Sequence, residues 1–220
     1  MKFFILGIIK INLKGEFFMN KQEFQNSETI VNLCRAFLME SQNGARYKFM
    51  EEKCNEEKYC YLAQLVKKAS DRCLAAGKVF YSLIEESMSD ASIEIEFDDL
   101  YPFRKASLAE NFLYSADEAA ISRDEIYLDF ATTAKEEGFK EIAEKFEYMY
   151  QIKDCLYLEM MEIANKMEAN KFYKNESLVK WKCDNCGHEH TGKEAWQKCP
   201  FCGFLQGHVI VEVEKDKQES

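Results

Sequence analysis

Two pairs of cysteines near the end of the chain have a spacing that can hold a metal ion. Cys183 and Cys186 form one Cys-x-x-Cys pair, and Cys199 and Cys202 form a second. A gap of two residues lets both thiolates of one turn reach the same ion, and four thiolates favour tetrahedral iron or zinc. The sequence therefore predicts one mononuclear metal site with these four cysteines as its ligands.

The residues around the cysteines do not decide between iron and zinc. His188 and His190 lie between the two pairs. Four sulfur atoms already complete a tetrahedron, so neither histidine is needed as a metal ligand. We expect both histidines to face solvent or to pack next to the cysteine ligands. Trp181, Phe201 and Phe204 are expected to form an apolar collar. Such a collar could help set the redox potential of an iron centre, or it could form the core of a structural zinc ribbon.

Four stretches that precede the cysteines have the periodicity of amphipathic helices, with apolar side chains at steps of three and four residues. These stretches are residues 28–56, 59–83, 108–130 and 139–160. Gly138 is expected to end the third helix in the left-handed conformation. Residues 87–105 lose the period, and a connection of that length can cross over between two helical hairpins. The sequence thus predicts a mainly α chain with a ferritin-like four-helix bundle.

The predicted domain organisation places a small metal-binding β domain after the bundle. A polar stretch of Asn, Lys, Glu and Ser separates the two, and the chain ends in a charged segment. In order, the expected units are a leader at residues 1–18, the bundle at 19–170, a linker at 171–179, the metal-binding domain at 180–213 and a tail at 214–220.

The first residues are expected to be an untranslated leader. Lys14 to Met19 can be encoded by a string that holds a ribosome-binding AGGAG before an ATG, so we hypothesise that translation starts at Met19. The apolar run from Phe3 to Ile9 is shorter than the roughly 20 residues of a membrane span, and no small-residue cleavage site follows it. We therefore expect a cytoplasmic protein without a membrane partner. The net charge of −10 disfavours nucleic-acid binding.

The chain resembles the rubrerythrin family over residues 28–210. In the C-terminal part the resemblance rests on Trp181-Lys182-Cys183, Cys186-Gly187, His190, Gly192, Ala195, Cys199-Pro200 and Cys202. In the bundle it rests on Glu40-Ser41-Gln42, Arg46-Tyr47, Glu125-Ile126-Tyr127, Phe130 and Glu136-Glu137-Gly138-Phe139. The resemblance implies a ferritin-like bundle with a diiron centre bound by carboxylates and histidines. It also implies a rubredoxin-like Fe(Cys)4 centre that feeds electrons to it, and NADH-linked peroxide reduction with external redox partners.

The sequence departs from the family at the expected diiron ligands. Glu40 matches the glutamate of the first helix and is the sole retained ligand position. The other six positions, two in each later helix, are Cys73, Ala76, Ala119, Ser122, Lys153 and Leu156. The three histidines of the chain all lie outside the bundle, at positions 188, 190 and 208. Nearby carboxylates such as Asp71, Glu118 and Glu125 do not follow the inward rows. We therefore expect the diiron centre to be absent.

Lys153 and Glu40 lie on the inward rows of their helices by periodicity. We hypothesise that the Lys153 ammonium pairs with Glu40 and supplies some of the charge neutralisation that metal gives in the family, because a single buried charge is costly. The alternative is that Lys153 extends its chain and holds its amine in water. Tyr47 and Tyr127 are expected to be core residues with hydrogen-bonded hydroxyls.

Five further cysteines lie in the helical part and are expected to be small apolar core residues rather than redox sensors. They are Cys34, Cys54, Cys60, Cys73 and Cys155. Cys73 is the strongest candidate for an exception, because it occupies a former ligand position.

Three functions remain open from the sequence. The first is one-electron transfer through one Fe(Cys)4 centre, with the bundle as a scaffold for docking and for a homodimer or higher homo-oligomer. The second is a zinc-ribbon module with a binding or regulatory role, and the third is a peroxide reductase with a rearranged metal site. The first and third need redox partner proteins.

Overall fold

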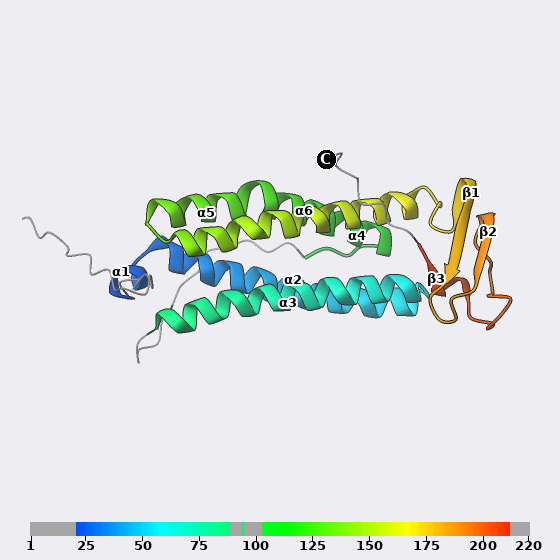
Figure 1. Cartoon of the computed structure of the whole chain (residues 1–220), viewed down its shortest axis with the longest axis horizontal. Helices are drawn as coiled ribbons and strands as arrows, with labels where there is room; N and C mark the ends of the chain where they lie inside the picture. The colour runs from blue at the N-terminus through cyan, green and yellow to red at the C-terminus, as the bar shows by residue number, and fades with distance from the viewer. Residues whose placement is uncertain (1–20, 89–93, 95–102, 212–220) are drawn as a thin grey trace, which may run out of the picture.

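The structure is a computed structural model that describes residues 21–88, 94 and 103–211. It is an elongated helical bundle with a small β-sheet at one end (Figure 1). The expected leader at residues 1–18, most of the connection at 87–105 and the tail at 214–220 lie outside the described residues. None of the helices in the described part is long and apolar enough to cross a membrane.

The bundle consists of two helical hairpins, as predicted. The first pairs α2 (Glu28–Glu56) with α3 (Cys60–Ser87), and a short helix α1 (Lys21–Gln25) precedes it. The second hairpin pairs α6 (Lys140–Glu168) with a rod made of α4 (Leu108–Ile121), a π-helical turn η1 (Ser122–Ile126) and α5 (Tyr127–Glu136). α3 ends far from the sheet, whereas α4 begins toward the sheet (Figure 1).

The turn between α5 and α6 also holds the beginning of α2. Gly138 has φ +87°, which confirms its predicted left-handed conformation at the end of α5. The carboxylate of Glu137 accepts hydrogen bonds from the backbone N–H groups of Glu28 and Thr29 at 2.9 and 2.8 Å. These two donors belong to the first turn of α2 and have no partner within their own helix. The second hairpin thus caps the first.

The bundle core has two apolar clusters with a polar layer between them. The cluster near α1 is aromatic and contains Phe24, Phe80, Tyr127, Phe130 and Phe146. The cluster toward the sheet is built mostly of aliphatic and small side chains from α3, α4 and α6. Glu40 and Lys153 are each 1% exposed. Along their helices, the residues on the α1 side of this pair belong to the aromatic cluster, and the residues on the sheet side belong to the aliphatic cluster. The pair therefore forms the polar layer between the clusters.

The C-terminal module is a three-stranded antiparallel sheet with two metal-binding turns. Its strands are β1 (Lys174–Cys183), β2 (Glu189–Glu194) and β3 (Val209–Ile210), in the order β2-β1-β3, with a 3-10 turn η2 (Gln206–His208) before β3. Trp181, Ala195 and Val209 form its small core. β1 begins inside the segment expected to be a linker, because the polar residues there pair with β2 at Glu194.

Candidate metal centre

The four cysteines predicted as ligands converge on one point. Their Sγ atoms all lie within 4.8 Å of one another, and the Cys183–Cys202 and Cys186–Cys199 sulfur pairs are each 3.7 Å apart. Metal–sulfur bonds of about 2.3 Å in a tetrahedron require sulfur–sulfur edges of about 3.8 Å. The sulfur cage therefore fits one tetrahedral iron or zinc ion. In the described part of the chain, it is the only group of three or more His, Cys, Asp or Glu side chains so placed.

The two turns that carry the cysteines also direct backbone amides toward them. Each turn closes through a glycine at positive φ, Gly187 at +73° and Gly203 at +78°, whose N–H donates to the carbonyl of the first cysteine at 2.9 Å. In the second turn, a hydrogen bond from the backbone N–H of Phe204 stabilises the Cys202 thiolate and lowers the pKa of that thiol to about 6. The turns thus stabilise negative charge on sulfur.

One edge of the sulfur cage faces solvent. Cys183 and Cys199 are buried, whereas Cys186 and Cys202 are only partly buried. The predicted apolar collar is wrong for Phe201, which is 77% exposed because it lies at the tip of the turn between two ligands. Trp181 packs inside the sheet, and Phe204 stacks edge-on against His208 at 4.6 Å between ring centroids. The exposed edge is therefore accessible to another molecule.

The metal-binding module docks on the α2–α3 turn of the bundle. Gln64 Nε2 donates to Asp184 Oδ2 at 2.6 Å, and the other oxygen of Asp184 contacts His208 Nδ1 at 3.0 Å. Gly207 lies so close to the backbone of Lys58 that a Cβ there would collide with the Lys58 carbonyl oxygen. Asp184 belongs to the first cysteine turn, so these contacts fix the sulfur cage relative to α3. Sequence reasoning missed this docking.

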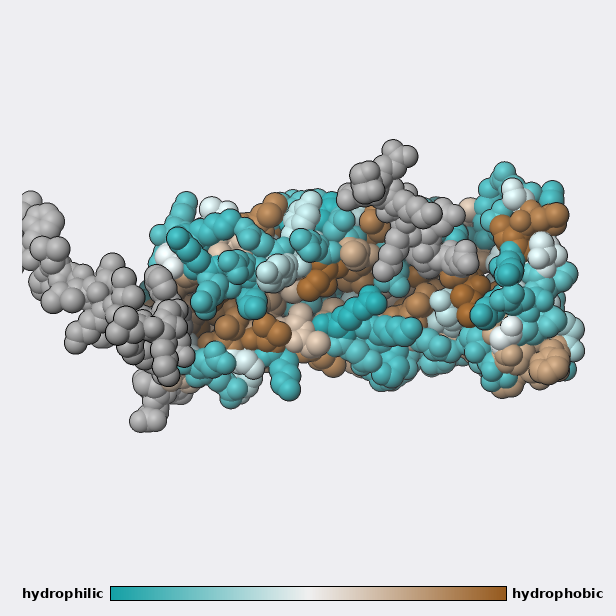
Figure 2. Space-filling view, viewed as in Figure 1, coloured by the Kyte–Doolittle hydropathy of each residue, from teal (hydrophilic) through white to brown (hydrophobic). Residues whose placement is uncertain are grey.

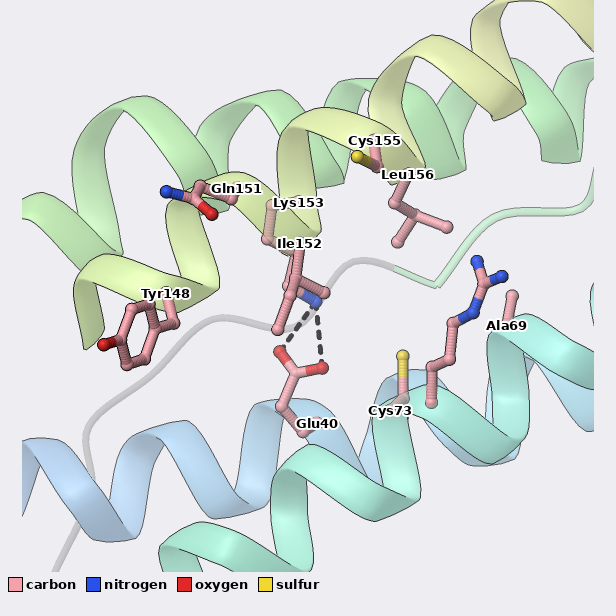
Figure 3. A pocket seen from close by; sticks show the side chains of 10 residues that line it. Glu40, Ala69, Cys73, Tyr148, Gln151, Ile152, Lys153, Cys155 and Leu156 are labelled. Carbon is pink, nitrogen blue, oxygen red and sulfur yellow. Dashed lines mark hydrogen bonds and ion pairs between the residues drawn. The ribbon is translucent and has the colours of Figure 1, made fainter. Parts of the chain in front are cut away.

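The centre of the bundle holds an ion pair (Figure 3). Lys153 Nζ lies 2.7 Å from Oε1 and 2.9 Å from Oε2 of Glu40, and the hydroxyl of Tyr127 donates to Glu40 Oε1 at 2.7 Å. The two charged side chains come from α6 and α2 and are at most 2% exposed. The hypothesised pair is therefore confirmed, and the alternative in which Lys153 holds its amine in water is wrong.

Two of the other positions that correspond to family ligands, Cys73 and Leu156, line the same cavity as this pair. Cys73 is 4% exposed, and burial raises the pKa of its thiol to about 12, with a further rise from its hydrogen bond to the Glu40 carboxylate. Ala119, Ser122 and Leu156 are buried, and Ala76 is partly buried. None of these side chains offers a carboxylate or an imidazole.

The nearby carboxylates that could replace the ligands are paired elsewhere or exposed. Glu118 pairs with Arg46 at 2.6 Å, and Asp71 pairs with Lys67 at 2.7 Å with 61% of its side chain exposed. Glu125, in η1, is exposed. The π-helical turn itself was not predicted. It begins at Ser122, one of the positions that the resemblance assigns to a ligand, and π-helical turns are frequent near functional sites.

The cysteines of the bundle differ in burial. Cys54 and Cys73 are buried, as predicted, and Cys34 and Cys60 are partly buried. Cys155 is exposed, so the expectation of a core residue is wrong there. Its position on α6 faces outward, beside Leu156, which faces the core.

Comparison with known proteins agrees with both parts of the fold. Residues 181–208 match the family model of the rubrerythrin rubredoxin-like domain. Rubrerythrin from Clostridium perfringens is 28% identical over 86% of this chain and 97% of its own. Rubrerythrin from Porphyromonas gingivalis is 28% identical over 90% and 96%.

Solved structures show the same architecture. A nigerythrin structure aligns with 84% of this chain and 86% of its own at a TM-score of 0.55 and 21% identity. A bacterioferritin from Desulfovibrio desulfuricans aligns with 70% and 86% at a TM-score of 0.59 and 18% identity. The bundle is therefore ferritin-like, as predicted, and the domain after it is rubredoxin-like. Over most of its length this chain is similar to rubrerythrins, and residues 181–208 match the rubredoxin-like domain of that family.

Proposed function

We propose that this protein is a one-electron carrier whose redox centre is a single iron bound by Cys183, Cys186, Cys199 and Cys202. Bound iron supplies the chemistry by alternating between the ferric and ferrous states. The observation that carries the proposal is the sulfur cage, which fits one tetrahedral ion and has one edge open to solvent. A structural zinc site needs no such exposed edge.

The residues of the module serve electron exchange in two ways. Backbone amides such as that of Phe204 stabilise negative charge on the sulfur atoms, and hydrogen bonds of this kind help set a redox potential. The partly buried Cys186 and Cys202 lie at the edge that a redox partner protein can approach. The contact between Gln64 and Asp184 keeps this edge in a fixed orientation on the bundle.

We further propose that the bundle has lost the diiron peroxide-reductase site of the family. Several carboxylates around two iron ions balance the charge of the metal. Here the one carboxylate of the layer, Glu40, is already neutralised by Lys153 and accepts a hydrogen bond from Tyr127. A metal cation placed beside the Lys153 ammonium would have too few negative ligands and would be repelled by the fixed positive charge.

A homodimer is the assembly that we propose. Five large apolar side chains on α2 and α3 are exposed, namely Leu38, Phe49, Leu74, Val79 and Tyr81. Exposed apolar side chains gathered on two adjacent helices are typical of an interaction site. We place the protein in the cytoplasm, where reducing conditions keep thiols available for metal.

Anaerobic purification from iron-replete cells, with metal analysis and an absorption spectrum, tests the proposal. One iron per chain with thiolate-to-iron charge-transfer bands, and no peroxide turnover, is the expected result. A colourless protein with one zinc from the same iron-replete preparation would favour the zinc-ribbon function. Two additional irons per chain together with peroxide turnover would favour a peroxide reductase with a rearranged site and would overturn the proposed loss.

A further inference from the structure

A cavity of about 350 Å³ opens between α3 and α6 and ends on the Glu40–Lys153 pair (Figure 3). Cavities of this size, between the helices of a bundle, are in the range that holds small organic molecules. The electron-transfer function proposed above uses only the sulfur cage at the end of the bundle. The cavity is therefore available for a separate role.

The walls of the cavity are largely apolar. Ala69 lines it from α3, and Ile152 and Leu156 line it from α6, with Tyr148 further along the same helix. Ile152 and Tyr148 are 45% and 53% exposed. Figure 2 shows apolar side chains along the middle of the bundle, with hydrophilic ones above and below them. A ligand with a narrow apolar body would cover this surface and displace water from it.

Among the described residues that line the cavity, Arg72 is the one charged residue that lies outside the Glu40–Lys153 pair. Lys153 and Glu40 neutralise each other, which leaves Arg72 among the charged residues that line it. The guanidinium of Arg72 contacts Glu159 at 3.5 Å, and its side chain is 58% exposed. A guanidinium has five N–H donors in a planar fork that matches a carboxylate. Arg72 thus retains donors for an anionic group at the mouth of the cavity.

From these contacts we infer that the cavity between α3 and α6 binds an aliphatic monocarboxylate. The carboxylate lies on Arg72, and the alkyl chain lies between the two helices against Ala69, Ile152 and Leu156. An amine of the same length is disfavoured, because it would meet the positive charge of Arg72. An alcohol of the same length keeps the apolar contacts and loses the charge-assisted hydrogen bonds.

Calorimetric titration of the full chain with octanoate, 1-octanol and octylamine tests the inference. Octanoate is expected to bind saturably at one site per chain, 1-octanol about tenfold more weakly, and octylamine more weakly still. Equal affinities for octanoate and octylamine would overturn the assignment of Arg72. The absence of saturable octanoate binding would overturn the site.

Variants separate the two parts of the site. Arg72→Gln should weaken octanoate binding about tenfold and leave 1-octanol binding unchanged. Arg35→Gln is the matched control, because Arg35 is also in an ion pair on the bundle surface but lies outside the cavity. It should change neither affinity, and a loss equal to that of Arg72→Gln would contradict the placement of the carboxylate.

Filling the cavity should abolish binding of both ligands. Ala69→Phe places a ring inside the cavity, and Ile152→Trp blocks its mouth from a partly exposed position where folding is less at risk. Octanoate binding that survives in a folded Ile152→Trp variant would overturn the inference. Sedimentation gives a further check. The cavity face could instead be buried between two copies of the chain. In that case Ile152→Trp would dissociate the dimer and the wild type would bind no octanoate, and this pair of results would also overturn the inference.

Discussion

The sulfur cage and the centre of the bundle are both places where side chains from separate elements converge, and they balance charge in opposite ways. In the cage, the sulfur atoms of four cysteines lie within 4.8 Å of one another. In the bundle, the carboxylate of Glu40 already has an ammonium at 2.7 Å and a phenol at the same distance. The first arrangement offers four ligands to a metal ion, whereas in the second the carboxylate is already paired with a cation. Charge balance therefore distinguishes these two places although both are built from converging side chains.

The largest effect is expected from the sulfur cage. Cys199→Ser removes a buried ligand and should abolish stoichiometric metal binding. Because structural four-ligand sites contribute about 10–16 kcal/mol of apparent binding free energy, the module should unfold while the bundle stays helical. Metal analysis, with amide spectra of residues 174–211, measures both effects.

Cys155→Ser is the control for this prediction, because Cys155 is an exposed cysteine of the bundle. It should leave the metal content unchanged. Full metal content in Cys199→Ser would show that the cage is not the metal site, and the contrast with the bundle would then have no basis.

The next effect tests whether the bundle centre is complete in itself. Lys153→Ala leaves the Glu40 carboxylate buried without its cation, so the free energy of unfolding should fall by about 3–5 kcal/mol. Replacing both partners, as Glu40→Leu with Lys153→Met, should cost much less, because apolar side chains of similar volume can replace a buried pair. Urea denaturation measures all variants.

Lys67→Ala is the matched control, because Lys67 pairs with Asp71 on the surface of α3. Its loss should be below about 1 kcal/mol. If Lys153→Ala is no more destabilising than Lys67→Ala, the ion pair does not hold the centre of the bundle together.

The bundle could be predicted from the sequence because its signal is local. Apolar residues at helical spacing placed α2 over residues 28–56, and Gly138 marked the end of α5. Both features depend on near neighbours in the chain. The π-helical turn at Ser122–Ile126 was not predicted, because no residue type distinguishes a π-helical turn from the α-helix around it.

The candidate site could be predicted where its chemistry allows only a few residue types, as in metal binding by cysteine. Four cysteines in two close pairs have few alternative explanations. A lysine on an apolar row either pairs with a buried carboxylate or reaches water, and the structure shows the pair with Glu40. The docking of the module was not predictable. Gln64 and Asp184 are ordinary surface residues by type, and their contact joins positions far apart in the chain.

A smaller effect is expected from the phenol that completes the bundle centre. Tyr127→Phe removes the hydrogen bond to Glu40 Oε1 and keeps the packing of the ring. A hydrogen bond to a charged group contributes about 1.5–3 kcal/mol, so the free energy of unfolding should fall by that amount. Tyr148→Phe, at an exposed position on α6, is the control and should have almost no effect. Equal losses in the two variants would mean that Tyr127 only fills space.

The smallest effect concerns Cys73, the thiol beside the ion pair, and it appears only at alkaline pH. Burial raises the pKa of Cys73 from 9.0 to about 12. The positive charges of Lys153 and Arg72 oppose this rise, and the charge of Glu40 adds to it. A group whose pKa is higher in the folded state stabilises the fold fully below its unfolded pKa and loses that contribution as pH rises through the folded value.

Stability from Cys73 should therefore decline between pH 9 and about pH 12, by about 1 kcal/mol at pH 10. Denaturation of wild type and Cys73→Ala across this range isolates the effect, because other alkaline titrations are common to both proteins. The wild type should lose more stability than the variant with each step in pH. Parallel curves would mean that the Cys73 thiol titrates alike in the folded and unfolded chain. The bundle centre would then be hydrated, and burial of its ion pair would no longer distinguish it from the partly exposed sulfur cage.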